Sequence, residues 1–555
     1  MKRGTHMKTA RRVFSLLLVL AMVFALVACG GSSETTDTDS GSKKTTSNAK
    51  PNSGSQAGNE DTENTDGTDV SQDTGSGEGP TSTSTITTPV TGTQDLTTNT
   101  EMTEDTFEPA DHNADDFADK IYTIIQHESI DTPFKYSQDS ALGSQVADRI
   151  VEVQSKYGCE LVFSQIAYGS NFATEMQGLQ FADDGGDMVF SSNNAQLRKT
   201  LGIGEDSLMV DLLTVDDIIN FWDFNKWGNI TARETMMSGG KFFGVSPALW
   251  IEATPLPFFQ VAYNKDLVES FGITDPQEFW ENEEWDRDNM MDLISSCYDD
   301  TTGMAIWGMT ADLGNMIRGT ALTTGATVVE IGKIYANGDV DWSLGLMSKD
   351  VEEALQWLKN NLSVYAKYFN NGKETWTKWQ EDDAFIAGQS VFCLTRPLDI
   401  FGEGCISSEV PNFGLITWAG ADANTMTGYY ENCYSIAIPT FAQSAQQTAY
   451  LMYDLFKGLG EIKTYGDVIQ HYRDTYFTSD IDVICLFREG ARLQYSYWPN
   501  GIDNIWASIT SSFSTTASIA ALLEKVEHTV DTEIETYMIP NTVQLEIYRQ
   551  NGLIK

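Results

Sequence analysis

Few side chains in this sequence have the types and spacing that catalysis needs. Five His occur, at positions 6, 112, 127, 471 and 528, and no two of them have metal-ligand spacing. There is no nucleophile elbow, no phosphate-binding glycine loop and no Cys-x-x-Cys pair. Carboxylates are plentiful, so counting them leaves a glycosidase pair open. The pattern favours a protein that catalyses no reaction and carries no metal or cofactor.

Composition narrows the class of partner. The chain has 35 Lys+Arg against 79 Asp+Glu, a formal net charge of −44, which repels phosphate backbones and anionic headgroups. Nucleic acid is therefore not an expected partner. Apolar residues make up 41% of the 555 positions, and a chain of this length is expected to form two or three folded units.

The first 29 residues have the pattern of a secretion signal. A basic stretch precedes an apolar run of about 16 residues, which is shorter than a membrane span. Residues 26–29 (LVAC) resemble the bacterial lipobox, which predicts that Cys29 becomes the acylated N-terminus. The protein is then expected at the extracellular face of a cell membrane, that of a Gram-positive bacterium. The alternative is an ordinary signal peptide in which this Cys occurs by chance.

Residues 30–116 are rich in Ser, Thr, Gly and Asp and contain almost no large apolar side chain. Such a segment buries too little surface to offset its ordering entropy, so it is expected to be a disordered tether. It would hold the folded part away from the membrane.

From residue 117 the pattern changes to alternating strands and helices. Strands are expected at 121–125, 159–166 and 187–190, with helices at 144–157 and 171–181 between them. This order predicts an α/β fold with a parallel sheet covered on both faces. Further helices are expected at 286–297, 348–365, 446–459 and 518–538.

Residues 241–247 (KFFGVSP) and 261–273 (VAYNKDLVESFGI) resemble the extracellular solute-binding proteins of family 1. These are the maltose-binding-protein-like receptor lipoproteins of ABC sugar importers. Weaker similarities follow in the family's order: residues 187–190 (DMVF), 284–286 (EWD), 385–392 (FIAGQSVF) and 434–439 (YSIAIP). Gly186 stands where the family has Pro.

The resemblance implies the periplasmic-binding-protein type II fold, in which two α/β lobes are joined by a hinge and a ligand cleft lies between them. The N-terminal lobe would comprise residues 117–258 and about 434–490. The C-terminal lobe would comprise 259–433 and about 491–555. The implied function is capture of an oligosaccharide or sugar-like solute by a monomer that delivers it to ABC permease subunits. The helix start at Asn264 and Asp266 is expected to serve structure.

The same resemblance implies the ligand contacts. A sugar presents an apolar C–H face and a rim of hydroxyl groups, so aromatic rings and hydrogen-bonding side chains are required. Trp506 matches the place of a stacking ring in sugar-binding relatives. The further candidates are Trp250, Glu252, Asn193, Asn194, Arg396, Asp399, Tyr430 and Trp418. Trp307 and Arg318 are expected in the first strand and the following helix of the C-terminal lobe, with Trp307 in its core. Each Trp has core packing as its alternative, and the two Asn have a polar turn.

One departure leaves the ligand class open. Leu398 stands where relatives often have a ring, and Arg396 and Asp399 beside it suit either hydroxyl groups or a carboxylate. The alternatives are a receptor of the same fold for a polyamine, cation or peptide, and a surface carbohydrate-active enzyme.

Overall fold

The computed structural model describes residues 109, 111–127, 133–135, 140–166, 172–182, 185–191, 207–220, 223–228, 236–238, 241–251, 253–301, 306–334, 340–365, 369–370, 381–402, 404–425, 433–487 and 502–533. The signal segment, Cys29 and most of the tether lie outside these residues. The last tether residues are described, and they already pack on the folded body. The ring of His112 lies 5.0 Å from that of Tyr157 and 4.8 Å from that of Tyr450. The ordered body therefore begins a few residues before position 117.

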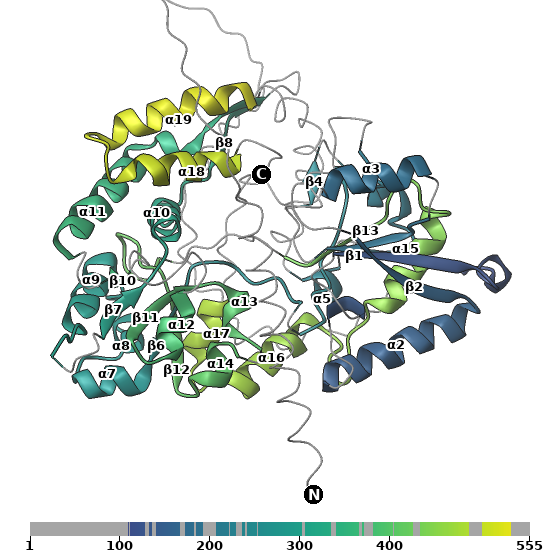
Figure 1. Cartoon of the computed structure of the whole chain (residues 1–555), viewed down its shortest axis with the longest axis horizontal. Coiled ribbons are helices and arrows are strands. Elements are labelled where there is room, and N and C mark those ends of the chain that lie inside the picture. Colours follow the sequence, from purple (N-terminus) through teal and green to yellow (C-terminus); the bar gives the residue numbers. More distant parts are fainter. Residues whose placement is uncertain are drawn as a thin grey trace, which may run out of the picture. The chain divides into compact units, whose positions relative to one another are not determined.

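The first sheet has the strand order β13-β3-β1-β2 (Figure 1). Its strands are β1 (Ile121–His127), β2 (Glu160–Ile166), β3 (Met188–Ser191) and β13 (Ser435–Ala437). β1 pairs in parallel with β2 and β3, whereas β13 runs antiparallel to β3. The parallel α/β arrangement predicted for residues 121–190 is confirmed.

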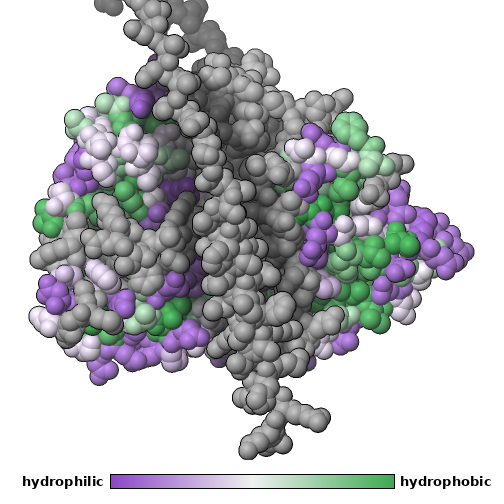
Figure 2. All heavy atoms as spheres, viewed as in Figure 1, coloured by the Kyte–Doolittle hydropathy of each residue, from purple (hydrophilic) through white to green (hydrophobic). Residues whose placement is uncertain are grey.

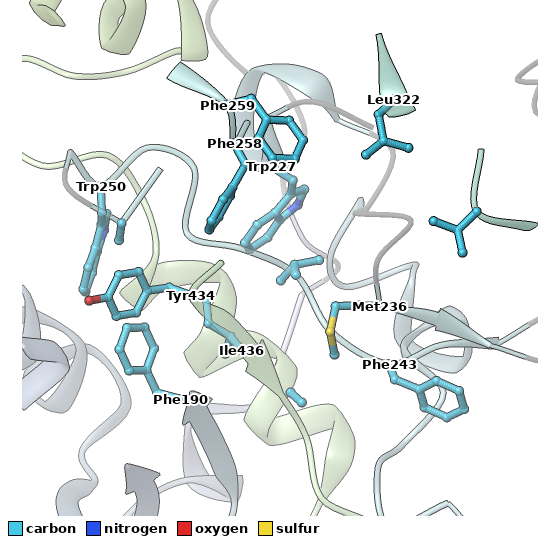
Figure 3. Close-up of a cluster of buried hydrophobic side chains, with 14 of the residues drawn as sticks. Phe190, Trp227, Met236, Phe243, Trp250, Phe258, Phe259, Leu322, Tyr434 and Ile436 are labelled. Atoms are coloured by element: carbon cyan, nitrogen blue, oxygen red, sulfur yellow. The ribbon is translucent and has the colours of Figure 1, made fainter. Parts of the chain in front are cut away.

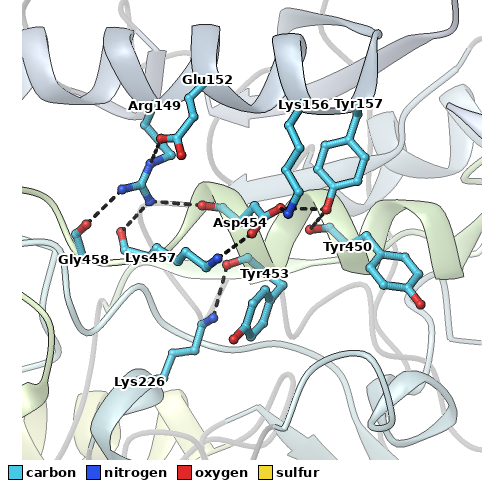
Figure 4. A network of polar contacts seen from close by, with 10 residues as sticks. All are labelled: Arg149, Glu152, Lys156, Tyr157, Lys226, Tyr450, Tyr453, Asp454, Lys457 and Gly458. Atoms are coloured by element: carbon cyan, nitrogen blue, oxygen red, sulfur yellow. Dashed lines mark hydrogen bonds and ion pairs between the residues drawn. The ribbon is translucent and has the colours of Figure 1, made fainter. Parts of the chain in front are cut away.

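Helices α2 (Ala141–Tyr157), α3 (Phe172–Ala182) and α15 (Ala445–Leu455) belong to this part of the chain. Ser140 caps α2 by accepting a hydrogen bond from the Gly143 amide, and Gly158 ends it in the left-handed region. α2 contacts the C-terminal end of α15 through a polar network (Figure 4). Arg149 donates to the carbonyls of Asp454, Lys457 and Gly458, and so satisfies groups that the end of α15 leaves open.

The second sheet has the order β10-β7-β11-β6-β12. Its strands are β6 (Gln260–Asn264), β7 (Trp307–Thr310), β10 (Phe369–Asn370), β11 (Ser390–Thr395) and β12 (Phe413–Thr417). β10, β7 and β11 are parallel, and β6 runs antiparallel to both β11 and β12.

The helices near this sheet begin with caps that the sequence predicts. The Asn264 side chain accepts from the Leu267 amide and starts α7 (Lys265–Phe271), which confirms its structural role. Asp286 likewise caps α9 (Arg287–Ser296). The other helices after β6 are α8 (Pro276–Glu281), α10 (Leu313–Leu322), α11 (Lys349–Tyr365), α12 (Glu381–Ile386), α13 (Pro397–Ile400), α14 (Ile406–Glu409), α16 (Tyr465–Tyr476), α17 (Asp480–Phe487), α18 (Ile502–Phe513) and α19 (Ile519–Glu533).

Shorter elements complete the described part of the chain. They are η1 (Ala114–Asp116), η2 (Pro133–Lys135), η4 (Leu212–Val215), α5 (Phe224–Trp227), β4 (Met237–Ser238), β5 (Lys241–Phe242), β8 (Val329–Ile334), β9 (Val340–Leu344) and η5 (Gly345–Met347). β4 pairs with β5, and β8 pairs with β9, each as an antiparallel two-stranded sheet.

After β13 the chain returns to the second sheet before residue 490, where the sequence placed the end of the N-terminal lobe. α17 packs against β12, and α16 packs against α17. Asp482 of α17 is completely buried and accepts hydrogen bonds from the Leu415 amide at 2.6 Å and from Gln277 Nε2 at 2.7 Å. α17 therefore belongs with the second sheet, and α16, which packs against α17 and also against α5, follows it there.

Residues 456–464, between α15 and α16, link the two sheets, as do two longer connections, residues 246–259 and the segment from Trp418 to Tyr434. Val245 forms an isolated antiparallel bridge with Ile436 beside the first sheet, and β6 of the second sheet begins at Gln260. Apolar side chains from both longer connections share a buried cluster that includes Trp250, Phe258, Phe259 and Tyr434 (Figure 3). Tyr434 stacks on Phe190 of β3 with ring centroids 5.6 Å apart.

The described surface mixes hydrophilic and hydrophobic residues, as the coloured part of Figure 2 shows. Large exposed hydrophobic side chains are scattered over separate elements: Ile121, Val151, Phe181 and Val364. Isolated exposed side chains of this kind are ordinary in water-facing domains. Among the helices that the structure describes, none combines the length and the apolar character needed to cross a membrane.

Candidate functional site

The carboxyl ends of three strands meet at one edge of the second sheet. β7, β11 and β12 run in the same direction, because β6 is antiparallel to its two neighbours and β7 is parallel to β11. Thr395 and Thr417 both pair with Gln260, so the two strands end level with each other. In open α/β sheets this edge collects ligands. Arg396 and Trp418, both predicted site residues, directly follow β11 and β12.

Trp418 is completely buried against α10. Its indole Nε1–H donates to Thr320 Oγ1 at 3.2 Å, and its ring packs on Gly319, where a Cβ would lie 3.1 Å from the ring atoms Cγ and Cδ1. Burial on this scale means that Trp418 fixes α10 to the end of β12. In this structure Trp418 therefore packs in the core, which was the alternative to ligand contact.

Trp506 lies on α18, which packs against α10. Its side chain is 5% exposed, and the guanidinium carbon of Arg318 lies 5.9 Å from its ring centroid. A guanidinium at this distance from an indole gives a cation–π contact. Trp506 and Trp418 therefore both contact α10, at Arg318 and at Gly319–Thr320. The structure thus brings together Arg318 and Trp506, two candidates that lie far apart in the sequence.

Arg396 and Asp399 form a bidentate ion pair within one turn of chain. Arg396 Nη2–H donates to Asp399 Oδ1 at 2.8 Å, and Nε–H donates to Oδ2. The two side chains are 19% and 20% exposed. Asp382 of α12 lies close enough to interact with both. Burial first, and then the Asp399 charge, raise the pKa of Asp382 to about 6. The guanidinium of Arg396 therefore binds the Asp399 carboxylate and also interacts electrostatically with that of Asp382.

Trp250 does not lie at the sheet edge but in the core. It is completely buried; its ring packs edge-on against Phe134 at 5.3 Å, and it also contacts Phe456 at 4.8 Å. Its Nε1–H donates to the Lys457 carbonyl at 3.0 Å. Both the apolar and the polar parts of the indole are used inside the protein. The expectation that Trp250 contacts a ligand is not supported by this placement, because its ring faces are covered.

The remaining predicted contacts are not placed. Asn193, Asn194, Glu252 and Tyr430 lie outside the described residues, as does the side chain of Leu398. The strand that precedes the two Asn is confirmed as β3. Asp187, just before it, accepts from the amides of Thr123 and Gln443 and so joins β1, β3 and the start of α15.

Gln260 is a residue at this edge that sequence reasoning missed. It is completely buried; its Nε2–H donates to the Pro257 carbonyl, and its Oε1 has no hydrogen-bond partner among the described residues. A lone Gln at the start of a strand carries no sequence signal of this kind. Within the described part of the chain, no three His, Cys, Asp or Glu side chains gather as a metal site.

The sheet orders and crossovers match a known architecture. A protein described as a sugar transporter from Rhizobium etli, solved in an open conformation, aligns with 74% of this chain and 99% of its own length at 14% identity and a TM-score of 0.51. The fold is that of the type II periplasmic binding proteins. An ABC substrate-binding protein from Listeria monocytogenes in complex with cycloalternan aligns with 75% of this chain and 99% of its own at 16% identity and a TM-score of 0.49.

A cyclo/maltodextrin-binding protein complexed with maltotetraose aligns with 79% of this chain and 98% of its own at 13% identity and a TM-score of 0.49. No family model matches the sequence, and no curated protein matches it either. The type II binding-protein fold expected from the sequence is confirmed, and identities this low establish the fold alone.

Proposed function

We propose that this protein is the solute-binding lipoprotein of an ABC importer and captures an oligosaccharide or sugar-like solute outside the cell. The type II binding-protein fold supports a binding role, because its two sheets are joined by crossovers about which a hinge motion can close on a ligand. The observation that carries the proposal is the pair of Trp506 and Arg318 on α18 and α10, at the sheet whose strand ends carry Arg396 and Trp418.

The chemistry of this pair suits a carbohydrate. The indole supplies a flat apolar surface for C–H groups, and the guanidinium supplies N–H donors for hydroxyl oxygens. Because Trp506 is only 5% exposed, its ring meets a solute only after its packing changes. Binding should therefore alter the fluorescence of Trp506 as well as stabilise the protein. Capture and release require no reaction, so we assign no catalytic role.

Ligand-induced thermal shifts test the proposal. The full chain is screened with maltotetraose, cycloalternan, spermidine and divalent cations, and a true ligand raises the midpoint with concentration. An oligosaccharide shift supports the proposal. A shift with spermidine or a cation alone would replace carbohydrate by that ligand class.

Two tryptophan variants locate the site. Trp506→Phe and Trp506→Ala should weaken oligosaccharide binding progressively, and the fluorescence change should be lost. Trp357→Ala is a matched control, since Trp357 of α11 also contacts a guanidinium, with Arg287 Cζ 5.0 Å from its ring centroid. Equal effects of the two alanine variants on the ligand-induced shift would argue against Trp506 as the binding ring.

The membrane anchor is proposed from the sequence alone. Cys29→Ala should move the protein from the membrane fraction to the medium, because several acyl chains together hold a protein at a bilayer. Labelling with a fatty-acid analogue gives a direct readout. A variant that still labels and sediments with membranes would show that Cys29 is not the acylated residue.

A further inference from the structure

The chemistry around Arg396 bears on the charge of the solute. Arg396 follows β11 directly, at the edge where the strands end, and is the kind of residue that captures carboxylates. In this structure its Nε–H and Nη2–H both donate to the two oxygens of Asp399. The fork that would hold a carboxylate of a solute is thus occupied by a carboxylate of the protein.

A second carboxylate strengthens this effect. Asp382 of α12 interacts electrostatically with both Asp399 and Arg396. One guanidinium therefore interacts with two acidic groups, and an incoming anion would meet excess negative charge. Like charges brought together in a poorly solvated place are strongly unfavourable.

A second residue at this edge of the sheet, Gln260, bears on the same question. Gln260 pairs in register with Thr395, the residue before Arg396. Its side chain is fully buried, and its Oε1 lacks a hydrogen-bond partner among the described residues. An amide oxygen can only accept a hydrogen bond, and because this one is buried, a solute would reach it only after the packing around it changes; such a solute would have to donate. A hydroxyl group donates, whereas an ionised carboxylate does not.

We propose that the Arg396–Asp399 pair and Asp382 make this binding protein select uncharged, hydroxyl-bearing solutes and reject their carboxylated counterparts. The inference rests on the proposed function, because it concerns the solute that the protein captures. Asp399 acts here through Arg396: it keeps the guanidinium engaged, so that only hydroxyl groups are recognised beside it. Acidic sugars such as uronates would be excluded.

Calorimetry on the full chain with maltotetraose and a maltotetraose oxidised to carry glucuronate tests this. The wild type should bind the neutral sugar at least about tenfold more tightly. Asp399→Asn removes the competing carboxylate and should reduce or reverse the ratio of the affinities for the neutral and the oxidised sugar. Glu353→Gln is the matched control, since Glu353 belongs to an exposed ion pair with Lys349 at 2.6 Å on α11. It should leave the ratio unchanged.

Each outcome has a separate meaning. Equal or tighter binding of the oxidised sugar by the wild type would overturn the inference and leave the proposed function standing. An unchanged ratio in a folded Asp399→Asn variant would also overturn it. If Asp399→Asn does not fold, Asp382→Asn takes its place and should shift the ratio in the same direction. If neither sugar binds the wild type but Asp399→Asn binds the oxidised one, the inference holds and maltotetraose is excluded as the solute. If no variant binds either sugar, the inference fails, and the thermal-shift screen with cycloalternan decides whether the proposed function stands.

Discussion

The indole ring of Trp418 packs directly on the backbone of Gly319. The contact is close because glycine has no side chain; a Cβ at position 319 would lie 3.1 Å from two ring atoms. The hydrogen bond from the same indole to Thr320 prevents the ring from sliding away. α10, which also carries Arg318, is thereby held at a fixed position relative to the end of β12.

Gly319→Ala should therefore destabilise the protein. The added methyl group forces Trp418 or α10 to shift, and overpacking of this kind costs about 1–3 kcal/mol in the free energy of unfolding. Urea unfolding at neutral pH measures the change. Gly178→Ala on α3 is the control: its added Cβ has no other atom within 4 Å, and it should stabilise the protein slightly. Similar losses for both variants would contradict the packing argument.

Gly414→Ala in β12 should destabilise the protein more than Gly319→Ala does. A Cβ on Gly414 of β12 would lie 2.3 Å from Cζ of Tyr263, whose hydroxyl donates to Asp275 Oδ1 at 2.8 Å. The ring cannot move without breaking that bond or the pairing of β6 with β12. We expect a loss of about 3 kcal/mol or more, or a failure to fold. A soluble variant with the wild-type urea midpoint would show that β12 moves easily.

Asp454→Asn should remove stability that exists only above acidic pH. Burial alone would raise the pKa of Asp454, but hydrogen bonds from Lys156, Lys457 and Tyr157 outweigh it and lower the pKa (Figure 4). A lowered pKa contributes stability at neutral pH that is lost as the pH falls through the folded-state value. The variant should lose about 2 kcal/mol near neutral pH and progressively less below the ordinary Asp range.

Glu152→Gln is the control for that experiment. Glu152 pairs with Arg149 at 3.0 Å but is 70% exposed, and surface pairs contribute little. Its urea midpoint should stay close to that of the wild type at every pH. A pH-independent difference between Asp454→Asn and the wild type would mean that lost packing, rather than lost charge, explains the effect.

Asp482→Asn should show the opposite pH dependence. Burial raises the pKa of Asp482 to about 6, although Lys265, the Leu415 amide and Gln277 act against the rise. A raised pKa means that the folded state takes up the proton more readily, so this group's contribution to stability falls as the pH rises from about 4 to about 6. The wild type should lose about 2 kcal/mol relative to the variant over that interval. Parallel stability curves for the two proteins would refute the assignment.

Local patterns predicted the elements of the fold but not which sheet each element joins. The strand at residues 187–190 and the cap at Asp286 were predictable, because buried apolar runs and capping side chains act over a few residues. The return of α16 and α17 to the second sheet was not. It depends on Asp482 meeting Leu415 and Gln277, which lie far away in the sequence.

The site was predictable in part for the same reason. Arg396 and Trp418 were expected at a ligand cleft, and the structure brings them to one edge of the second sheet, but the strand that places Trp418 there, β12, was not among the expected strands. Trp250 stands in a loop whose composition suits a contact residue, but distant Phe134 and Phe456 cover its ring. The unsatisfied oxygen of Gln260 is a property of three-dimensional packing that no spacing rule detects.

The order in which the strands are made has a consequence for biosynthesis. β3 ends at Ser191, but its neighbour β13 begins only at Ser435, so one edge of the first sheet stays open until most of the polypeptide has been synthesised. All the strands of the second sheet are synthesised between β3 and β13, whereas α17, which packs against β12, is synthesised after β13. A nascent chain that stops between residues 417 and 435 therefore has every strand of the second sheet but lacks β13, and the open edge of its first sheet would be prone to aggregation.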